Sequence, residues 1–242
     1  VFGWHLGVSD RDVYLHTLPQ FHCNGWGMPY AVSAMGGKHI ILRKVDGGEI
    51  LRRIDEHGVT VMCGAPVVLN MVLDAAQHWD GPIPGKGRVR IVVAGAPPPT
   101  RTIERCETVL GWEFIQIYGL TETAPLLTMN RRRAEYDDLT PSERAQKLGR
   151  AGAPVVGCTL ETSAEGEIKA RANMVMTGYW EQPEATSRVI RDGFFHTGDG
   201  GTIDDDHYAV ITDRKKDVII SGGENVSSIE VEDVLFKHPE IT

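Results

Sequence analysis

Eight consecutive residues, 118–125 (YGLTETAP), combine side chains that could act together on one ligand. The glycine lets the backbone approach a ligand closely. The hydroxyls of Thr121 and Thr123 can donate to phosphate oxygens, and the leading tyrosine can stack on a base. Glu122 can hold Mg²⁺, which prefers oxygen ligands and the company of phosphate. The alternative is a turn in which the two threonines merely satisfy the backbone.

The elements around this segment predict how it is positioned. An apolar strand, residues 113–117 (EFIQI), runs directly into it, and ligands of open α/β sheets bind beyond the carboxyl ends of strands. Further strands are expected at 39–43, 59–63 and 88–93, with helices at 48–57, from Pro66, and after Thr100 as a cap. Alternating strands and helices predict a parallel α/β sheet with crossover helices.

The pattern changes after about residue 147. Short strand-like runs separated by glycines follow, namely VVGCTLE, GEIKA, VMTGYW, FFHTGD and HYAVITD. At the end, DVIIS resembles a strand, and residues 227–236 resemble a helix that Ser227 or Ser228 could cap. We therefore predict an α/β fold: a parallel α/β sheet layer over 1–147, a β-rich subdomain over 148–213, and the start of a small α+β domain over 214–242.

Composition narrows the function classes. The 242 residues carry a net charge of −8, which argues against nucleic acid as the main partner. The run Arg131–Arg133 and the charged stretch 131–147 are expected to be solvated surface. Four scattered cysteines favour a reducing cytoplasm over a disulfide framework. No apolar run is long enough for a membrane span, and both chain ends look cut, so a fragment is expected. The sequence leaves the oligomeric state open.

The 118–125 segment resembles the signature of adenylate-forming enzymes, which include acyl-CoA synthetases, peptide-synthetase adenylation domains and luciferases. Five further segments match in the same order, so the resemblance extends over nearly the whole chain. They are LPQFHCNGWG at 18–27, Gly95-Ala96-Pro97, VMTGYW at 175–180, FFHTGD at 194–199 and DRKKDVIISGGENVSSIEVE at 213–232. Within the family the chain is most similar to medium- and long-chain fatty acyl-CoA synthetases and related short-acid CoA ligases.

The resemblance implies a set of residues that bind the nucleotide. Tyr118 would stack on adenine, with Gly119 beside it. The other sides of the base would be lined by Gly95, Ala96, Pro97 and Gln116.

The resemblance also implies residues for the phosphates and the ribose. Thr121 would contact the α-phosphate, and Glu122 would help to hold Mg²⁺. Asp199 would accept hydrogen bonds from both ribose hydroxyls, and Arg214 would reach the ribose or a phosphate.

Four further residues would serve the acid, the hinge and CoA. His22 would border the acyl pocket, and Lys216 would lie at the hinge of the small domain. Gly222 and Gly223 would let the pantetheine arm of CoA pass close to the backbone.

Each implied role has a plainer alternative. Asp199 could be a turn aspartate, His22 a core histidine, and Gly222-Gly223 a hairpin turn. The charged run that contains Arg214 and Lys216 could be a solvated face. The order of the motifs favours the functional interpretation over all of these.

The resemblance implies an ATP-dependent acyl-CoA synthetase. A carboxylate, expected to be a medium- or long-chain fatty acid, attacks the α-phosphorus of ATP to give acyl-AMP, and the CoA thiol then takes the acyl group as AMP leaves. Small molecules would be its partners, with ATP or AMP, Mg²⁺ and CoA as ligands. Such chemistry depends on positioning and charge neutralisation.

Two rival functions stay open. One is an amino-acid or aryl-acid adenylation domain, although residues 23–34 contain no acidic side chain for a substrate ammonium. The other is a non-catalytic nucleotide-binding fragment, against which the intact Glu122, Asp199 and Arg214 argue. The family's phosphate loop and C-terminal catalytic lysine do not occur among the 242 residues, so we expect this chain alone to have little or no adenylation activity.

Overall fold

The structure is a computed structural model that describes residues 1–95, 98–214, 219–221, 224–226, 231, 234, 235 and 238. Side chains are not described for Asn24, for Trp26 or for the strand residues from 213 to 226. The chain forms two compact units. The first contains residues 1–117 and 130–149, and the second contains 118–129 and 150–242.

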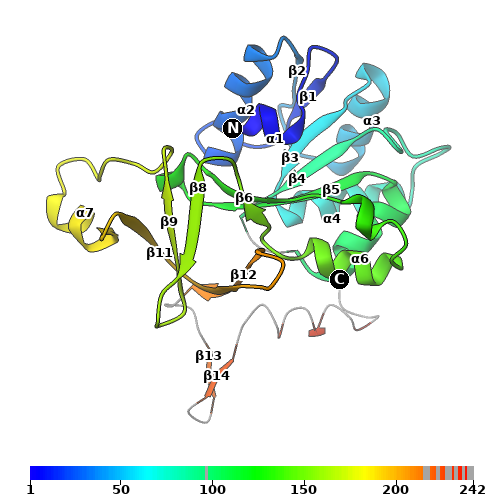
Figure 1. Ribbon diagram of the computed structural model, residues 1–242. Helices are drawn as coiled ribbons and strands as arrows, with labels where there is room; N and C mark the ends of the chain where they lie inside the picture. The colour runs from blue at the N-terminus through cyan, green and yellow to red at the C-terminus, as the bar shows by residue number, and fades with distance from the viewer. Residues whose placement is uncertain are drawn as a thin grey trace. The chain divides into compact units, whose positions relative to one another are not determined.

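Five parallel strands form the sheet of the first unit. They are β1 (Val13–His16), β2 (Lys38–Ile41), β3 (Val61–Gly64), β4 (Arg90–Val93) and β5 (Glu113–Gly119), in the order β2-β1-β3-β4-β5 (Figure 1). The predicted parallel α/β sheet is therefore confirmed. Strand β5 runs two residues further than expected, so its last residues already belong to the 118–125 segment.

Helices connect these strands and cover the sheet. They are α1 (Phe2–Leu6), α2 (Cys23–Ala34), α3 (Gly47–His57), α4 (Pro66–Ala76), α5 (Thr100–Arg105) with its continuation η1 (Cys106–Leu110), the short η3 (Ala134–Tyr136), and α6 (Pro141–Leu148). The expected helices at 48–57 and from Pro66 are confirmed. Thr100 is not a cap, because Pro99 holds the N-cap position and Thr100 is already helical.

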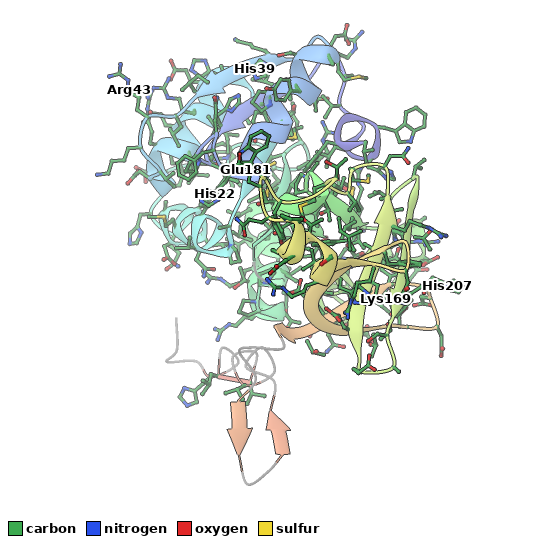
Figure 2. All side chains as sticks on the ribbon, turned by 90° about the vertical axis from the view of Figure 1, so that its left-hand side faces the viewer. His22, His39, Arg43, Lys169, Glu181 and His207 are labelled. Carbon is green, nitrogen blue, oxygen red and sulfur yellow. The ribbon has the colours of Figure 1, made fainter. Side chains whose placement is uncertain are left out.

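One apolar core joins α3, α4, α5 and α6 to one face of the strands. Ile50, Leu51 and Ile54 of α3 pack here, and all three are fully buried. Helix α2 contacts the opposite face of β2, since Ser33 Oγ lies 3.1 Å from Nε2 of His39, a strand residue labelled in Figure 2. The crossover helices thus cover both faces, which explains the nearly continuous apolar sequence of strands such as β3.

The second unit is built from antiparallel strands. Strands β8 (Cys158–Thr162), β9 (Glu167–Ala172), β10 (Ile190–Arg191), β11 (Phe194–Ile203) and β12 (Ala209–Arg214) pair in the order β10-β11-β9-β8, with β12 on β11 (Figure 1). Strand β6 (Leu126–Asn130) pairs with β7 (Ala153–Pro154), and β13 (Ile219–Ser221) pairs with β14 (Glu224–Val226). This unit also holds η2 (Thr121–Thr123) and α7 (Pro183–Val189). The predicted β-rich subdomain is confirmed, whereas most of the helix expected at 227–236 lies outside the described residues.

One sequence expectation about local structure is wrong, because VMTGYW at 175–180 forms no strand. The charged stretch 131–147 is mostly exposed, as expected. Arg144 is an exception, because it is only 9% exposed and pairs with Glu107 at 2.7 Å. Arg131 likewise pairs with Glu113 at 2.8 Å. The run of charges predicted solvent exposure for both arginines, because a single sequence does not show which arginine forms an ion pair with a carboxylate.

Helix α2 was not expected, because Gly25, Gly27 and Pro29 all lie within it. Its packing explains one of these residues. A Cβ atom on Gly25 would lie 2.2 Å from the carbonyl oxygen of Pro19, so only glycine fits against the incoming loop. Tertiary packing here outweighs intrinsic helix propensity.

Candidate functional site

The 118–125 segment is a tight loop that begins inside strand β5. Tyr118 and Gly119 close the strand, η2 follows, and Ala124 turns the chain with a φ of 56°. A Cβ atom on Gly119 would lie 1.5 Å from the carbonyl oxygen of Pro125. Gly119 is therefore needed for the loop to close on itself.

The two threonines of the loop differ in their surroundings. Thr123 is fully buried, and its hydroxyl exchanges hydrogen bonds with Leu120 and donates to the Pro125 carbonyl at 2.7 Å. Thr123 thus takes the plainer structural role. Thr121 is exposed, which leaves its side chain open to solvent at the outer side of the turn.

Glu122 is held at both its backbone and its side chain. The Tyr179 hydroxyl donates to Oε1 of Glu122 at 2.9 Å, and the Met176 amide donates to the Glu122 carbonyl at 2.7 Å. Burial, with the hydrogen bond and the charge of Glu122, raises the pKa of Tyr179 above its ordinary value. Tyr179 therefore stays a hydrogen-bond donor at neutral pH and orients this carboxylate.

Asp199 is brought to the tyrosine of the loop. The Tyr118 hydroxyl donates to Oδ2 of Asp199 at 2.7 Å, across 81 positions of sequence. Asp199 is only 7% exposed, and its Cα lies opposite that of Arg214 in the β11–β12 pairing. The plainer alternative of a free turn aspartate is wrong, because this carboxylate is buried inside strand β11 and hydrogen-bonded to the loop.

Three of the predicted residues that the structure describes lie in the first unit. Gln116, on β5, is 4% exposed, and its Oε1 has no hydrogen-bond partner in the described part of the chain. Gly95 follows β4 with a φ of 100° and an open surrounding. His22 is the N-cap residue of α2 and is exposed, so a core histidine is excluded (Figure 2). The unpartnered Oε1 of Gln116 can therefore accept a hydrogen bond from a donor such as an exocyclic amine.

The other predicted positions fall outside what the structure describes. Ala96, Pro97, Lys216, Gly222 and Gly223 are not among the described residues, and only the backbone of Arg214 is placed. Their implied roles stay predictions.

Sequence reasoning missed Tyr179. It lies within VMTGYW, which was recognised as a motif, but the hydroxyl was given no partner. The tyrosine hydroxyl within this motif was the available signal. Nothing in the sequence indicated that its partner is Glu122, 57 positions away.

The donor set around Glu122 fits a shared Mg²⁺ rather than a closed metal cage. Among the described residues, no group of three or more histidine, cysteine, aspartate or glutamate side chains could hold a metal ion. Mg²⁺ is commonly bound by one or two carboxylates together with substrate phosphates and water. A single oriented carboxylate is consistent with that arrangement.

The chain resembles known proteins over most of its length. It is 46% identical over 250 residues to a 2-methylpropanoate–CoA ligase of Humulus lupulus, covering 97% of this chain and 44% of that protein. The O-succinylbenzoate coenzyme A synthetase of Bacillus subtilis, solved with ATP and magnesium ion, matches at 28% identity and a TM-score of 0.83, covering 98% of this chain and 49% of that one. A Mycobacterium tuberculosis fatty acyl CoA synthetase matches at 30% identity and a TM-score of 0.75, with coverages of 98% and 47%.

The chain thus spans about half the length of the relatives it matches. No helix in the described ranges is both long and apolar enough to cross a membrane. The model of one family, the AMP-binding enzymes, matches residues 2–180, which include the 118–125 loop and Tyr179. The chain belongs to the AMP-binding enzyme family.

Proposed function

We propose that the protein containing this chain is an ATP-dependent acyl-CoA synthetase. It would join a carboxylic acid to CoA by way of an acyl-AMP intermediate, releasing pyrophosphate and then AMP. The observation that carries the proposal is the hydrogen bond between Tyr118 and Asp199. It joins an aromatic ring that can stack on a base to a buried carboxylate that can accept from a ribose.

In this proposal the second unit provides the groups for the nucleotide. Tyr118 stacks on adenine, and Asp199 accepts from the ribose hydroxyls. A carboxylate has about four lone-pair positions and can accept from several donors at once. Thr121, exposed beside Glu122, donates to the α-phosphate.

Glu122 would hold Mg²⁺ jointly with phosphate oxygens. When bound, the ion neutralises charge on the phosphates. The contribution of this chain is orientation: Tyr179 and the Met176 amide fix the glutamate before the ion and ATP arrive. Less ordering then remains to be done on binding.

The first unit would serve both the acid and the base. His22, exposed at the N-terminus of α2, would border the acyl pocket. Gln116 would use its unpartnered oxygen to accept from the adenine amine, and Gly95, Ala96 and Pro97 would also serve the base. Gly119 would do so from the second unit.

The remaining positions would serve the second half-reaction. We assign 1–147 and 148–213 to a large domain and 214–242 to the start of a small one, with Lys216 as the hinge. Arg214 would reach the ribose or a phosphate, and Gly222 and Gly223 would admit pantetheine. Rotation about such a hinge would exchange the adenylation groups for the CoA path.

We propose a medium- or long-chain fatty acid as the substrate and the cytoplasm as the location. Support for the acid comes from the motif resemblance and from the absence of an acidic side chain in residues 23–34. The names of the relatives span 2-methylpropanoate, O-succinylbenzoate and fatty acyl groups, so the acid is the finer part of the proposal.

A panel of acids tests the function. The full-length protein is given ATP, Mg²⁺, CoA and one acid at a time: octanoate, palmitate, 2-methylpropanoate, an aryl acid or an amino acid. We expect acid-dependent pyrophosphate–ATP exchange and the most acyl-CoA with octanoate or palmitate. Exchange that needs an amino acid and yields no acyl-CoA would favour the adenylation-domain alternative, and absence of exchange with every acid would favour a non-catalytic nucleotide binder.

A further inference from the structure

Strand β11 is interrupted at the residues that carry Asp199. We propose that Glu167, on the neighbouring strand β9, is the positioning residue that holds this interruption and thereby sets the Asp199 carboxylate for the ribose. The inference rests on the proposed function, since it concerns the same nucleotide site.

The interruption is visible in the strand pairing. His196 lies opposite Lys169, but the next pair is Gly200 opposite Glu167, so β11 advances four residues where β9 advances two (Lys169 is labelled on β9 in Figure 2). Thr197, Gly198 and Asp199 occupy the bulge. Bulges of this kind redirect side chains next to functional sites, and they take backbone groups out of the regular ladder.

Side chains replace the lost ladder bonds. The Gly198 amide, at a φ of 77°, donates to Oε1 of Glu167 at 2.9 Å. The Thr197 hydroxyl donates to the Ile168 carbonyl at 2.8 Å and accepts from the Asp199 amide at 3.1 Å. Glu167 and Thr197 therefore bond the two backbone amides that the bulge takes out of the regular ladder.

Glu167 holds the bulge from two sides. Its Oε2 lies 3.2 Å from Nδ1 of His196, the residue that precedes the bulge, and its side chain is only 13% exposed. Arg191 lies 2.9 Å from the same ring nitrogen. The carboxylate thus reaches both the entrance and the middle of the bulge, and Asp199 is the next residue after Gly198.

The other side of the same strand leaves Asp199 little room to adjust. The β11–β12 pairing shifts between Asp199 and Gly201, and a Cβ atom on Gly201 would lie 2.5 Å from the Val210 carbonyl oxygen. With β12 this close, the path of the bulge depends on the β9 side. Removing the Glu167 acceptor should let the bulge relax and move the Asp199 carboxylate away from Tyr118.

The test compares nucleotides that differ only in the ribose hydroxyls. Calorimetry on the full-length protein measures the Kd of AMP and of 2′,3′-dideoxy-AMP for the wild type, Glu167→Ala and Glu167→Gln. Glu161→Ala is the control, because Glu161 lies on the adjacent strand β8 of the same sheet, pairs with Lys169 at 3.1 Å and does not contact the bulge in the described structure.

We expect the wild type to bind AMP about tenfold more tightly than dideoxy-AMP, the ratio that hydrogen bonds to a charged acceptor support. Glu167→Ala should lose most of this ratio through weaker AMP binding, with dideoxy-AMP unchanged. Glu167→Gln should keep most of it, because the amide oxygen still accepts from Gly198. A general loss of stability would weaken both ligands together and leave the ratio intact.

The outcomes separate the two proposals. A folded Glu167→Ala protein with the full wild-type ratio would overturn the role of Glu167 while leaving the ribose site standing. A wild type that does not distinguish the ligands would overturn the ribose site and, with it, this inference. If Glu167→Ala does not fold, Glu167→Asp, which keeps the charge but shortens the reach, decides by the same ratio: its loss supports the role and its retention overturns it.

Discussion

The buried His16 and the half-buried His39 form a pair, and this pair makes a pH dependence of stability predictable. His16 ends β1, is 7% exposed, and its Nε2 lies 2.9 Å from Nδ1 of His39. The Tyr14 ring packs edge-on against His16, and Ser33 of α2 contacts the far nitrogen of His39. Burial, and then the charge of His39, lower the pKa of His16 from 6.5 to about 4.

The sign of the effect follows from proton binding. Because the pKa of His16 is lower in the folded protein, the unfolded chain binds the extra proton as the pH falls. The stabilisation is complete above the unfolded pKa of 6.5 and is lost progressively down to about pH 4. Linkage between these two values gives a loss of about 0.8 kcal/mol at pH 6 and about 2 kcal/mol at pH 5.

The assay is urea unfolding, followed by tryptophan fluorescence, at pH 8, 7, 6 and 5 for the wild type and His16→Gln. The variant has lower stability at pH 8 but no proton to bind, so its free energy of unfolding should fall by about 2 kcal/mol less than the wild type's between pH 8 and pH 5. His78→Gln, at an exposed ring whose Nδ1 lies 3.2 Å from the Asp74 carbonyl oxygen, should follow the wild-type slope. Parallel pH curves for the wild type and His16→Gln would refute the reasoning.

Three further substitutions, one of them with a matched control, test the loop and the fold. Tyr179→Phe removes the hydroxyl that orients Glu122, so the KM for Mg²⁺–ATP should rise about threefold to tenfold with little change in Tm; an unchanged KM would contradict the orienting role. Gly119→Ala places a Cβ 1.5 Å from the Pro125 oxygen and should cost about 3 kcal/mol or more in urea unfolding. Gly48→Ala, in α3, places a Cβ at an ordinary contact distance of 3.4 Å from Oδ1 of Asp46 and should cost nothing, and equal effects would refute the close-approach argument. Asp12 is buried, and burial opposes its ionisation. Hydrogen bonds from Thr60, Ser9 and Arg90 nevertheless lower its pKa. The stabilisation from the ionised Asp12 is therefore lost as the pH falls through that lowered pKa. Asp12→Asn should therefore cost about 3 kcal/mol at pH 7 and less in acid, and an equal cost at pH 7 and pH 2 would contradict this.

The sequence alone was sufficient to predict the succession of strands and helices along the chain and to recognise the family. Apolar runs and helical periodicity depend on local side-chain spacing, so the strands at 59–63, 88–93 and 113–117 and the helix at 48–57 were predictable. The 118–125 string was recognisable because its residue types are needed together, whatever surrounds them.

Local signals failed where packing opposed them. Helix α2 contains two glycines and a proline, and Gly25 is required there because a Cβ atom would meet the Pro19 carbonyl. Arg144 reads as a surface charge, yet it is buried because Glu107 lies within 2.7 Å. Glu107 lies 37 positions before Arg144, so the contact that buries this arginine comes from outside the local sequence.

The chemistry of the 118–125 loop was determined partly by the sequence and partly by the tertiary structure. Sequence determined that Thr121, Glu122 and Thr123 are present beside a tyrosine at the end of a strand. Only the tertiary structure decided that Thr123 is consumed by the backbone, that Tyr179 orients Glu122, and that Tyr118 meets Asp199. The physical reason is that a hydrogen bond needs its two atoms within about 3 Å. Over 81 positions of chain, that distance is set by strand register and a bulge rather than by residue type.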